Sequence, residues 1–147
     1  MSKCIHHEVE LGIVIGKKCK NISKKDAMDY ILGYLVALDI TARDIQINMK
    51  KKGWPWTIAK SFDTFGAYGP YIVTDLDPDN VELKTYLNGQ LMQQDNTKNC
   101  VFNVSKVLSF ITRHITSPYR FEIDPGRPPI GLNPGFILTI FLGKAVV

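Results

Sequence analysis

The sequence predicts an α+β domain that is mostly β, in which a mixed sheet is accompanied by a few peripheral helices. Strand-like apolar or alternating runs recur along the chain, and helix-start signals lie between some of them. A third observation is the Asn88-Gly89 dipeptide between two strand-like segments, which is typical of a β-hairpin. With 147 residues, 45% of them apolar, the chain is long enough to form one domain with its own core.

The first half begins with a strand followed by a helix. Residues 8–15 alternate acidic and apolar side chains and then become fully apolar, as a strand does when it runs from a cleft into a core. A helix is expected from Ser23 to Gly33. Ser23 and Asp26 have the spacing of a capping box, and glycine is a common helix-ending residue.

A second strand and a second helix follow. Residues 34–38 form an apolar run of strand length that ends next to Asp39. Thr41 and Asp44 repeat the spacing of a capping box, so a helix is predicted from there to Gly53.

The second half predicts a hairpin, a helix and a different C-terminal segment. Residues 81–95 form the hairpin around Asn88-Gly89, and Asn103 caps a helix that continues to Ile115. Five of the eight prolines lie in residues 118–134, and the chain ends on apolar residues. We therefore divide the chain into a main domain, residues 1–116, and a Pro-rich and apolar tail, residues 117–147.

Composition and charge exclude several classes of protein. The net charge is +4, but the lysines gather in residues 17–25 and 50–52 without stacking aromatics interleaved among them, so we expect no nucleic-acid partner. The first residues show no signal or transit peptide, and the longest apolar stretch, residues 136–142, is too short to cross a bilayer. The three cysteines form no Cys-x-x-Cys pair, which favours a reducing compartment. The sequence thus predicts a soluble protein without a membrane partner.

Three carboxylates are the candidate metal ligands. Glu8 and Glu10 are two residues apart on the first strand, and Asp39 ends the second apolar run. Three hard oxygen ligands without cysteine suit Mg²⁺ or Mn²⁺ better than zinc. Alternating acids are also typical of a solvent-exposed strand face, and the pattern alone leaves both interpretations open. His6 and His7 could bind zinc, but no further His or Cys lies at ligand spacing, so we interpret them as strand-end residues.

Four motifs resemble one known family. Residues 6–12 (His-His-Glu-Val-Glu-Leu-Gly), 27–30 (Ala-Met-Asp-Tyr), 38–44 (Leu-Asp-Ile-Thr-Ala-Arg-Asp) and 59–62 (Ala-Lys-Ser-Phe) closely resemble the fumarylacetoacetate hydrolase family, in particular its small acylpyruvase and oxaloacetate decarboxylase branch. The resemblance covers roughly residues 4–116, and the motifs occur in the family's order.

The resemblance implies a mixed β-sheet roll, usually a homodimer, that holds Mg²⁺ or Mn²⁺ through three carboxylates. Carried across residue by residue, the metal ligands are Glu8, Glu10 and Asp39. The positions that bind the substrate's carboxylate and carbonyl oxygens are Arg43, Gln46 and Lys60, and Lys60 is the catalytic candidate. A solvated lysine is the alternative interpretation of Lys60.

The implied function is metal-dependent chemistry at carbon–carbon bonds of small β-diketo or α-keto acids. Acylpyruvate hydrolysis, oxaloacetate decarboxylation and oxaloacetate tautomerisation all pass through an enolate, which a divalent Lewis acid stabilises. The sequence does not choose among them. The implied location is mitochondrial or cytoplasmic.

The sequence departs from the family pattern at both ends. Family members carry a His and Glu pair ahead of the first metal strand, whereas here only seven residues precede Glu8. Near the other end the family expects Thr-Gly-Thr-Pro, and residues 139–142 have Thr-Ile-Phe-Leu instead. These departures predict a chain truncated at its N-terminus and divergent at its C-terminus. The alternative function is therefore a non-catalytic variant that retains a partial metal site and the dimer surface.

Overall fold

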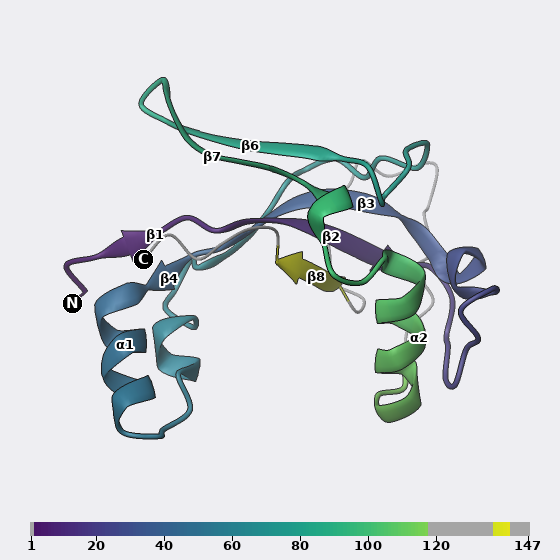
Figure 1. Cartoon of the computed structure of the whole chain (residues 1–147), viewed down its shortest axis with the longest axis horizontal. Coiled ribbons are helices and arrows are strands. Elements are labelled where there is room, and N and C mark those ends of the chain that lie inside the picture. Colours follow the sequence, from purple (N-terminus) through teal and green to yellow (C-terminus); the bar gives the residue numbers. More distant parts are fainter. Residues whose placement is uncertain (1, 118–136, 142–147) are drawn as a thin grey trace.

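The computed structural model of the chain describes residues 2–117 and the backbone of residues 137–141. Two long antiparallel strands, β2 (Val9–Ile15) and β3 (Ile31–Asp39), cross the middle of the molecule (Figure 1). Helix α1 (Arg43–Lys51) lies at one end of these strands and helix α2 (Val104–His114) at the other. The molecule is mostly sheet with two α-helices in the described ranges, which confirms the predicted α+β class.

The described strands form one central sheet and two small ones. The central sheet has the order β5-β3-β2-β8, with β5 at Gly66–Tyr68 and β8 at Ile137–Phe141. One small sheet pairs β1 (Ile5–His6) with β4 (Thr41–Ala42). The other is the hairpin of β6 (Glu82–Leu87) and β7 (Gln90–Asn96), which projects above β2 and β3 in Figure 1.

The predicted first strand is confirmed, but the predicted helix after it is wrong. All seven residues of β2 are buried. The segment from Ser23 contains only the 3₁₀ turn Ala27–Tyr30, although the Ser23 hydroxyl does donate to the Asp26 carboxylate at 2.6 Å. Gly33, expected to end a helix, lies inside β3. A Cβ there would lie 2.6 Å from a side-chain carbon of Ile72, so this glycine permits close packing instead.

The helix predicted after Asp39 is confirmed, with a different start. Thr41 belongs to β4, and its hydroxyl donates to the carbonyl of Asp39 at 2.9 Å rather than capping the helix. Asp44 accepts from the backbone of Lys3 at 2.9 Å and from the Ser2 hydroxyl. Both side chains of the expected capping pair are thus engaged by residues outside the helix, and α1 begins at Arg43.

The hairpin and the third predicted helix are confirmed. Asn88 and Gly89 have φ angles of 51° and 82°, the left-handed values that a two-residue hairpin turn requires. The Asn103 side chain accepts from the backbone of Lys106 at 3.1 Å, as expected of an N-cap.

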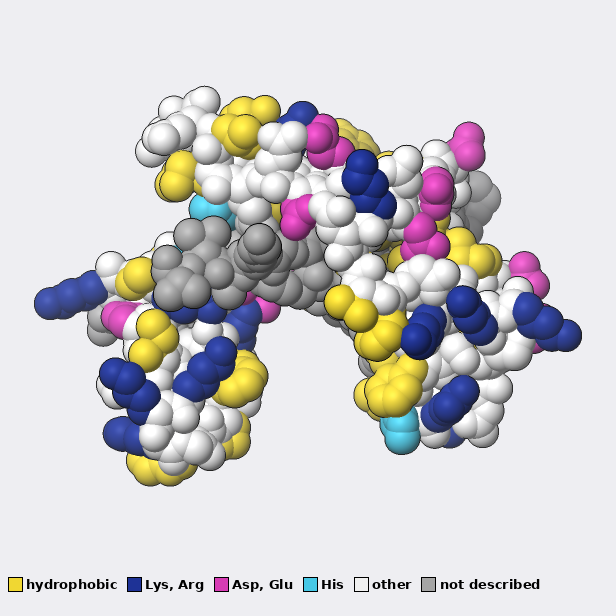
Figure 2. All heavy atoms as spheres, in the orientation of Figure 1, with side chains coloured by type: hydrophobic (Ala, Val, Ile, Leu, Met, Phe, Trp, Pro, Cys, Tyr) yellow, Lys and Arg dark blue, Asp and Glu magenta, His cyan; other side chains and the backbone are white. Residues whose placement is uncertain are grey.

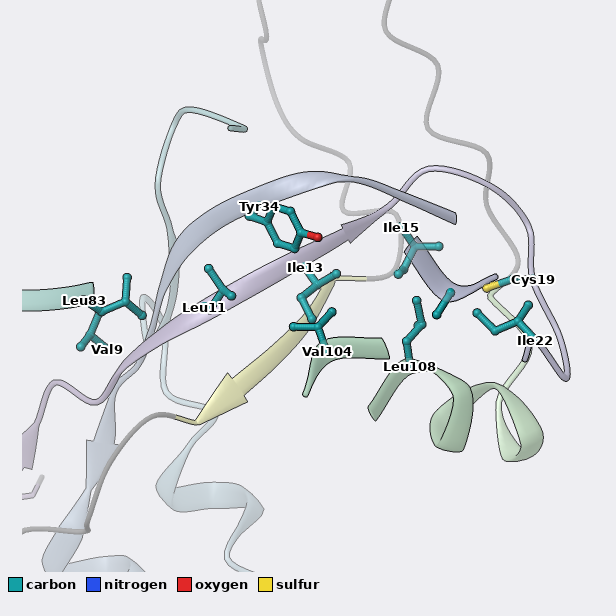
Figure 3. Packing of buried hydrophobic residues seen from close by; sticks show 11 residues of the cluster. Val9, Leu11, Ile13, Ile15, Cys19, Ile22, Tyr34, Leu83, Val104 and Leu108 are labelled. Atoms are coloured by element: carbon teal, nitrogen blue, oxygen red, sulfur yellow. The ribbon is translucent and has the colours of Figure 1, made fainter. Parts of the chain in front are cut away.

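The hydrophobic core lies between β2, α2 and the hairpin (Figure 3). Ile13 has no exposed surface, and Leu108 of α2 is 1% exposed. Leu83 of β6 belongs to the same cluster as Val9 of β2, which joins the base of the hairpin to the sheet. The core therefore fixes the hairpin relative to the start of β2.

The C-terminal tail predicted for residues 117–147 is described only in part. Residues 118–136 and 142–147 lie outside the described residues. The backbone of β8 pairs antiparallel with β2, from Glu10 opposite Phe141 to Val14 opposite Ile137. A segment of the predicted tail therefore supplies a strand of the central sheet.

Lysine and arginine side chains gather over the two helical ends of the molecule (Figure 2). The run at residues 50–52 is not simply solvated, because the ammonium of Lys50 lies 5.0 Å from the Trp56 ring centre and that of Lys52 lies 4.6 Å from the Trp54 ring centre. In the described ranges, no helix has the length and apolar character that crossing a membrane requires.

Candidate active site

Strand register brings two of the predicted metal ligands together. Val9 pairs with Leu38, and the Asp39 N–H donates to the Glu8 carbonyl at 3.0 Å. Glu8 and Asp39 therefore lie opposite each other at the end of the β2–β3 ladder. Arg43 is brought to the same place by the β1–β4 pairing, since its N–H donates to the carbonyl of Cys4 at 2.8 Å.

Glu8 is the centre of the described ion pairs at this site. Its carboxylate accepts from the Arg43 guanidinium through Oε1, and its Oε2 lies 3.4 Å from the Lys60 ammonium. Only 10% of the Glu8 side chain is exposed. Burial strengthens the attraction between these charges and also adds a desolvation cost, so removing either cation would leave this buried carboxylate uncompensated.

Lys60 joins Glu8 to Asp39. Its ammonium forms an ion pair with Asp39 Oδ2 in addition to the contact with Glu8. Lys60 follows the short 3₁₀ turn Thr57–Ala59, whose last residue is completely buried. The Lys60 side chain is 21% exposed. Its position between two carboxylates favours the functional interpretation over a solvated lysine.

Arg43 makes a three-way contact. Besides Glu8, its Nη1 donates to Gln46 Oε1, and its Nε lies 3.4 Å from His6 Nδ1. Among the described residues, these contacts use three of the five N–H groups of a guanidinium and leave two. Gln46 is 5% exposed, and because its oxygen faces the arginine, no contact within residues 2–117 is given for its amide NH₂, which can still donate.

His6 supports Arg43 as a neutral acceptor. Burial, followed by the nearby charge of Arg43 and by His7, lowers the pKa of His6 below its ordinary value. Since a guanidinium can only donate, His6 Nδ1 must accept, and the imidazole proton is on Nε2, 3.5 Å from the sulfur of Cys4. His6 is the second residue of β1, as the strand-end interpretation predicted.

The predicted metal ligands are not gathered as a ready-made set of three. Within residues 2–117, no group of three or more His, Cys, Asp and Glu side chains could hold a metal ion as they are placed. Glu8 and Asp39 share the Lys60 ammonium, whereas Glu10 is 3% exposed and has interactions of its own. Glu8 and Asp39 therefore already share one positive charge, and their oxygens are the ligand type that Mg²⁺ and Mn²⁺ prefer. The donor chemistry fits a divalent ion.

The charges of the site also fit a divalent ion. If all three predicted ligands belong to the site, their charges and those of Arg43 and Lys60 sum to one net negative charge, which repels an anionic substrate. A bound divalent ion would turn this into one net positive charge. The site as it stands is therefore complementary to a metal ion, and with the ion to a carboxylate.

The residues that line an apolar cavity of about 430 Å³ are close in sequence to these site residues. Ile5, Phe62 and Phe65 supply its apolar lining, with Ser2 and Asp63. None of the six predicted site residues lines it.

Gln93 was missed by sequence reasoning. Its side-chain oxygen accepts from the backbone N–H of Val9, between Glu8 and Glu10, at 2.9 Å. Thr85 lies directly opposite Gln93 in the hairpin, and its hydroxyl oxygen is buried without a hydrogen-bond partner in the described part of the chain. The sequence predicted only that Gln93 lies in the polar second strand of the hairpin, because no local pattern predicts a contact between residues 84 positions apart.

The fold and the network of carboxylates, arginine and lysine can now be compared with known protein families. The family described as fumarylacetoacetate (FAA) hydrolase C-terminal matches residues 1–126. The chain belongs to the fumarylacetoacetate hydrolase family, as its motifs predicted.

Two named relatives are similar over most of this chain. The oxaloacetate tautomerase FAHD1, mitochondrial, of Homo sapiens is 42% identical over 132 residues, which cover 88% of this chain and 59% of the relative. The oxaloacetate decarboxylase, mitochondrial, of Dictyostelium discoideum is 47% identical over 135 residues, which cover 90% of this chain and 62% of the relative. The chain thus spans less than two thirds of the length of either relative.

Solved structures of the family share the fold. The fumarylpyruvate hydrolase from Pseudomonas aeruginosa in complex with Mn²⁺ and pyruvate is 30% identical, with a TM-score of 0.72. That match covers 79% of this chain and 51% of the hydrolase. The crystal structure of Cg1458 is 31% identical, with a TM-score of 0.75, and the match covers 98% of this chain and 51% of the Cg1458 chain.

Proposed function

We propose that the chain carries the metal-binding and substrate-binding side chains of an enzyme acting on carbon–carbon bonds of small α-keto or β-diketo acids. Glu8, Glu10 and Asp39 would hold Mg²⁺ or Mn²⁺. The observation that carries this proposal is the network in which Glu8 contacts Arg43 and Lys60 while Lys60 also contacts Asp39. The Mn²⁺ and pyruvate named for the similar hydrolase support both the metal and the substrate class.

The chain's own residues divide the work of binding and charge stabilisation. A bound divalent ion would supply a Lewis acid for the keto-acid oxygens. The N–H groups of Arg43 that have no partner among the described residues can donate to a substrate carboxylate, and the Gln46 amide can donate to a neighbouring carbonyl oxygen. The Lys60 ammonium can stabilise negative charge that develops on a substrate oxygen, or deliver a proton from Nζ. We assign the catalytic role to Lys60.

Acylpyruvate hydrolysis, oxaloacetate decarboxylation and oxaloacetate tautomerisation all require the same binding of a keto acid. Each reaction develops negative charge on the keto-acid oxygen, so each can use the same cationic side chains. Relatives named for tautomerase and decarboxylase activities are about equally similar to this chain. All three reactions therefore belong to the proposal.

The test is an assay of the purified chain with Mg²⁺ or Mn²⁺, following the loss of oxaloacetate and of acetylpyruvate. We expect turnover above the rate with metal alone, and a fall in kcat/KM of about 100-fold or more in Lys60→Met, the size found when one charge-stabilising donor is removed. Lys52→Met, at a lysine packed over Trp54, is the matched control and should keep full activity.

Two outcomes of this assay separate the proposal from its alternative. No turnover above metal alone by the folded chain would sink the enzymatic proposal. Retained Mn²⁺ binding in that same sample would favour the non-catalytic variant with a partial metal site.

We also propose that the chain forms a homodimer, as its family resemblance implies. Exposed apolar side chains on the central sheet support this, with Val36 of β3 47% exposed and Tyr68 of β5 45% exposed on the opposite face. Sedimentation equilibrium should give twice the mass of 16.6 kDa, and a monomer at high protein concentration would contradict the dimer.

We also propose a mitochondrial or cytoplasmic location for the protein. The names of the two mitochondrial relatives support the mitochondrial alternative, and imaging of the tagged protein tests the proposal.

A further inference from the structure

The backbone of Glu8 is unusual. Its φ angle is 40°, in the left-handed region that residues with a Cβ seldom adopt. Such a conformation is unfavourable for a residue other than glycine, so the surrounding structure must hold it in place. Glu8 immediately precedes β2, and its carboxylate is the one that contacts both Arg43 and Lys60.

The peptide that joins Glu8 to Val9 is held from both sides. Its carbonyl oxygen accepts from the N–H of Asp39 at 3.0 Å, which continues the ladder between β2 and β3. Its N–H donates to the side-chain oxygen of Gln93 at 2.9 Å. The two hydrogen bonds come from different elements, β3 and β7, so together they fix the orientation of this peptide.

A side chain meets the Val9 N–H because the described backbone pairing on that side of β2 stops short of it. The described ladder between β2 and β8 ends at Glu10 opposite Phe141. Gln93 supplies the acceptor one residue further along. Val9 is 2% exposed, and a buried N–H without an acceptor destabilises the folded state, so this hydrogen bond contributes to stability.

The hairpin that carries Gln93 is anchored firmly enough to act as a support. Leu83 of β6 is 6% exposed and belongs to the core cluster that contains Val9. At the base of the hairpin the N–H of Val81 donates to the Thr97 hydroxyl at 2.7 Å. The position of Gln93 is therefore set by the core and not by the loop at the hairpin tip.

We propose that Gln93 is a positioning residue for Glu8: by accepting from the Val9 N–H it holds the left-handed backbone that directs the Glu8 carboxylate into the site. The metal-ligand role of Glu8 in this statement rests on the proposed function. The hydrogen bond acts on the backbone of a ligand, and Gln93 itself is not assigned any contact with metal or substrate.

The experiment compares three variants by Mn²⁺ affinity, measured from the electron paramagnetic resonance signal of free Mn²⁺. Gln93→Met keeps the length of the side chain and removes the acceptor, and we expect the dissociation constant to rise about 10- to 100-fold, as for other residues that orient metal ligands. Gln93→Glu restores an acceptor and should bind Mn²⁺ at least as tightly as the unmodified chain. Gln94→Met is the matched control, because Gln94 bonds only to Glu82 among the contacts described, at 2.6 Å, and it should leave the affinity unchanged.

A second readout is independent of metal. Amide hydrogen exchange at Val9, measured by NMR without metal, should accelerate at least about tenfold in Gln93→Met and stay slow in Gln93→Glu and Gln94→Met, because loss of a 1.4 kcal/mol interaction changes an opening equilibrium tenfold. Unchanged exchange and unchanged Mn²⁺ affinity in Gln93→Met would overturn the inference, as would an equal loss in Gln93→Glu. If the unmodified chain binds no Mn²⁺, the proposed function fails, while the Val9 exchange rate still decides the role of Gln93.

Discussion

The left-handed backbone of Glu8 predicts an unusual ranking of glycine and alanine variants. Glu8→Gly and Glu8→Ala both remove the carboxylate and its ion pairs, so their difference isolates the backbone. At a φ of 40° the alanine Cβ is strained and glycine is not. Glu10, two residues further along in β2, lies inside the strand and provides the same comparison at an extended residue.

The expected size follows from two opposing effects. The left-handed conformation costs a residue with a Cβ about 1–2 kcal/mol. Glycine loses about 0.5–1 kcal/mol more conformational entropy on folding than alanine. Glu8→Gly should therefore be more stable than Glu8→Ala by about 0.8 kcal/mol, the centre of a range of about 0–1.5 kcal/mol. At Glu10 alanine should be the more stable by about 0.5–1 kcal/mol.

The assay is urea unfolding of the four variants, followed by circular dichroism at equal protein concentration and without metal. The midpoint order should be glycine above alanine at Glu8 and alanine above glycine at Glu10. Alanine more stable than glycine at both positions would refute the reasoning, because it would show that Glu8 has an ordinary extended backbone in solution.

Three further predictions concern the core, a buried phenol and the cysteines. In chemical denaturation, Leu108→Ala should lower the free energy of unfolding by about 2–5 kcal/mol, because Leu108 is 1% exposed. Phe110 lies on the same helix but is 61% exposed, so Phe110→Ala should lower it by less than about 1 kcal/mol. Equal losses in the two variants would contradict the core assignment. Burial raises the pKa of Tyr34 from 10.0 to about 12, so the stability that this neutral phenol contributes is present below pH 10 and is lost as the pH rises towards 12. Tyr34→Phe should flatten the decline of the unfolding midpoint over this pH range. An unchanged slope in the variant would contradict the prediction. Iodoacetamide should modify the exposed Cys4 well before Cys19, which is 3% exposed and whose thiol pKa is raised by burial, and equal rates in peptide mass spectrometry would contradict this.

Strong local signals explain which elements could be predicted from sequence. The apolar run of residues 9–15, the Asn88-Gly89 turn and the Asn103 cap each fix a backbone conformation within a few residues, and each is found in the structure. The helix expected from Ser23 failed although its capping contact to Asp26 exists. Tertiary pairing of β3 with β2 overrides that local signal.

The sequence motifs indicated which residues to expect in the candidate site, but they did not predict how the side chains contact one another. The motifs placed Glu8, Asp39 and Lys60 in one site, and the β2–β3 register together with Lys60 brings these three side chains together. No sequence pattern indicated that a lysine lies between two of the expected metal ligands. No sequence pattern indicated the left-handed backbone of Glu8. The hydrogen bond from the Val9 N–H to Gln93 could not be predicted either, because it joins residues 84 positions apart.

The central claim is that three carboxylates of this chain bind one divalent ion, and a Mn²⁺ titration tests it most directly. Isothermal calorimetry on the purified chain should show saturable binding of one Mn²⁺ per chain. The affinity should fall at least about tenfold, an energy of about 1.4 kcal/mol, in each of Glu8→Gln, Glu10→Gln and Asp39→Asn. Absence of saturable binding by the folded chain, or unchanged affinity in all three variants, would contradict the account.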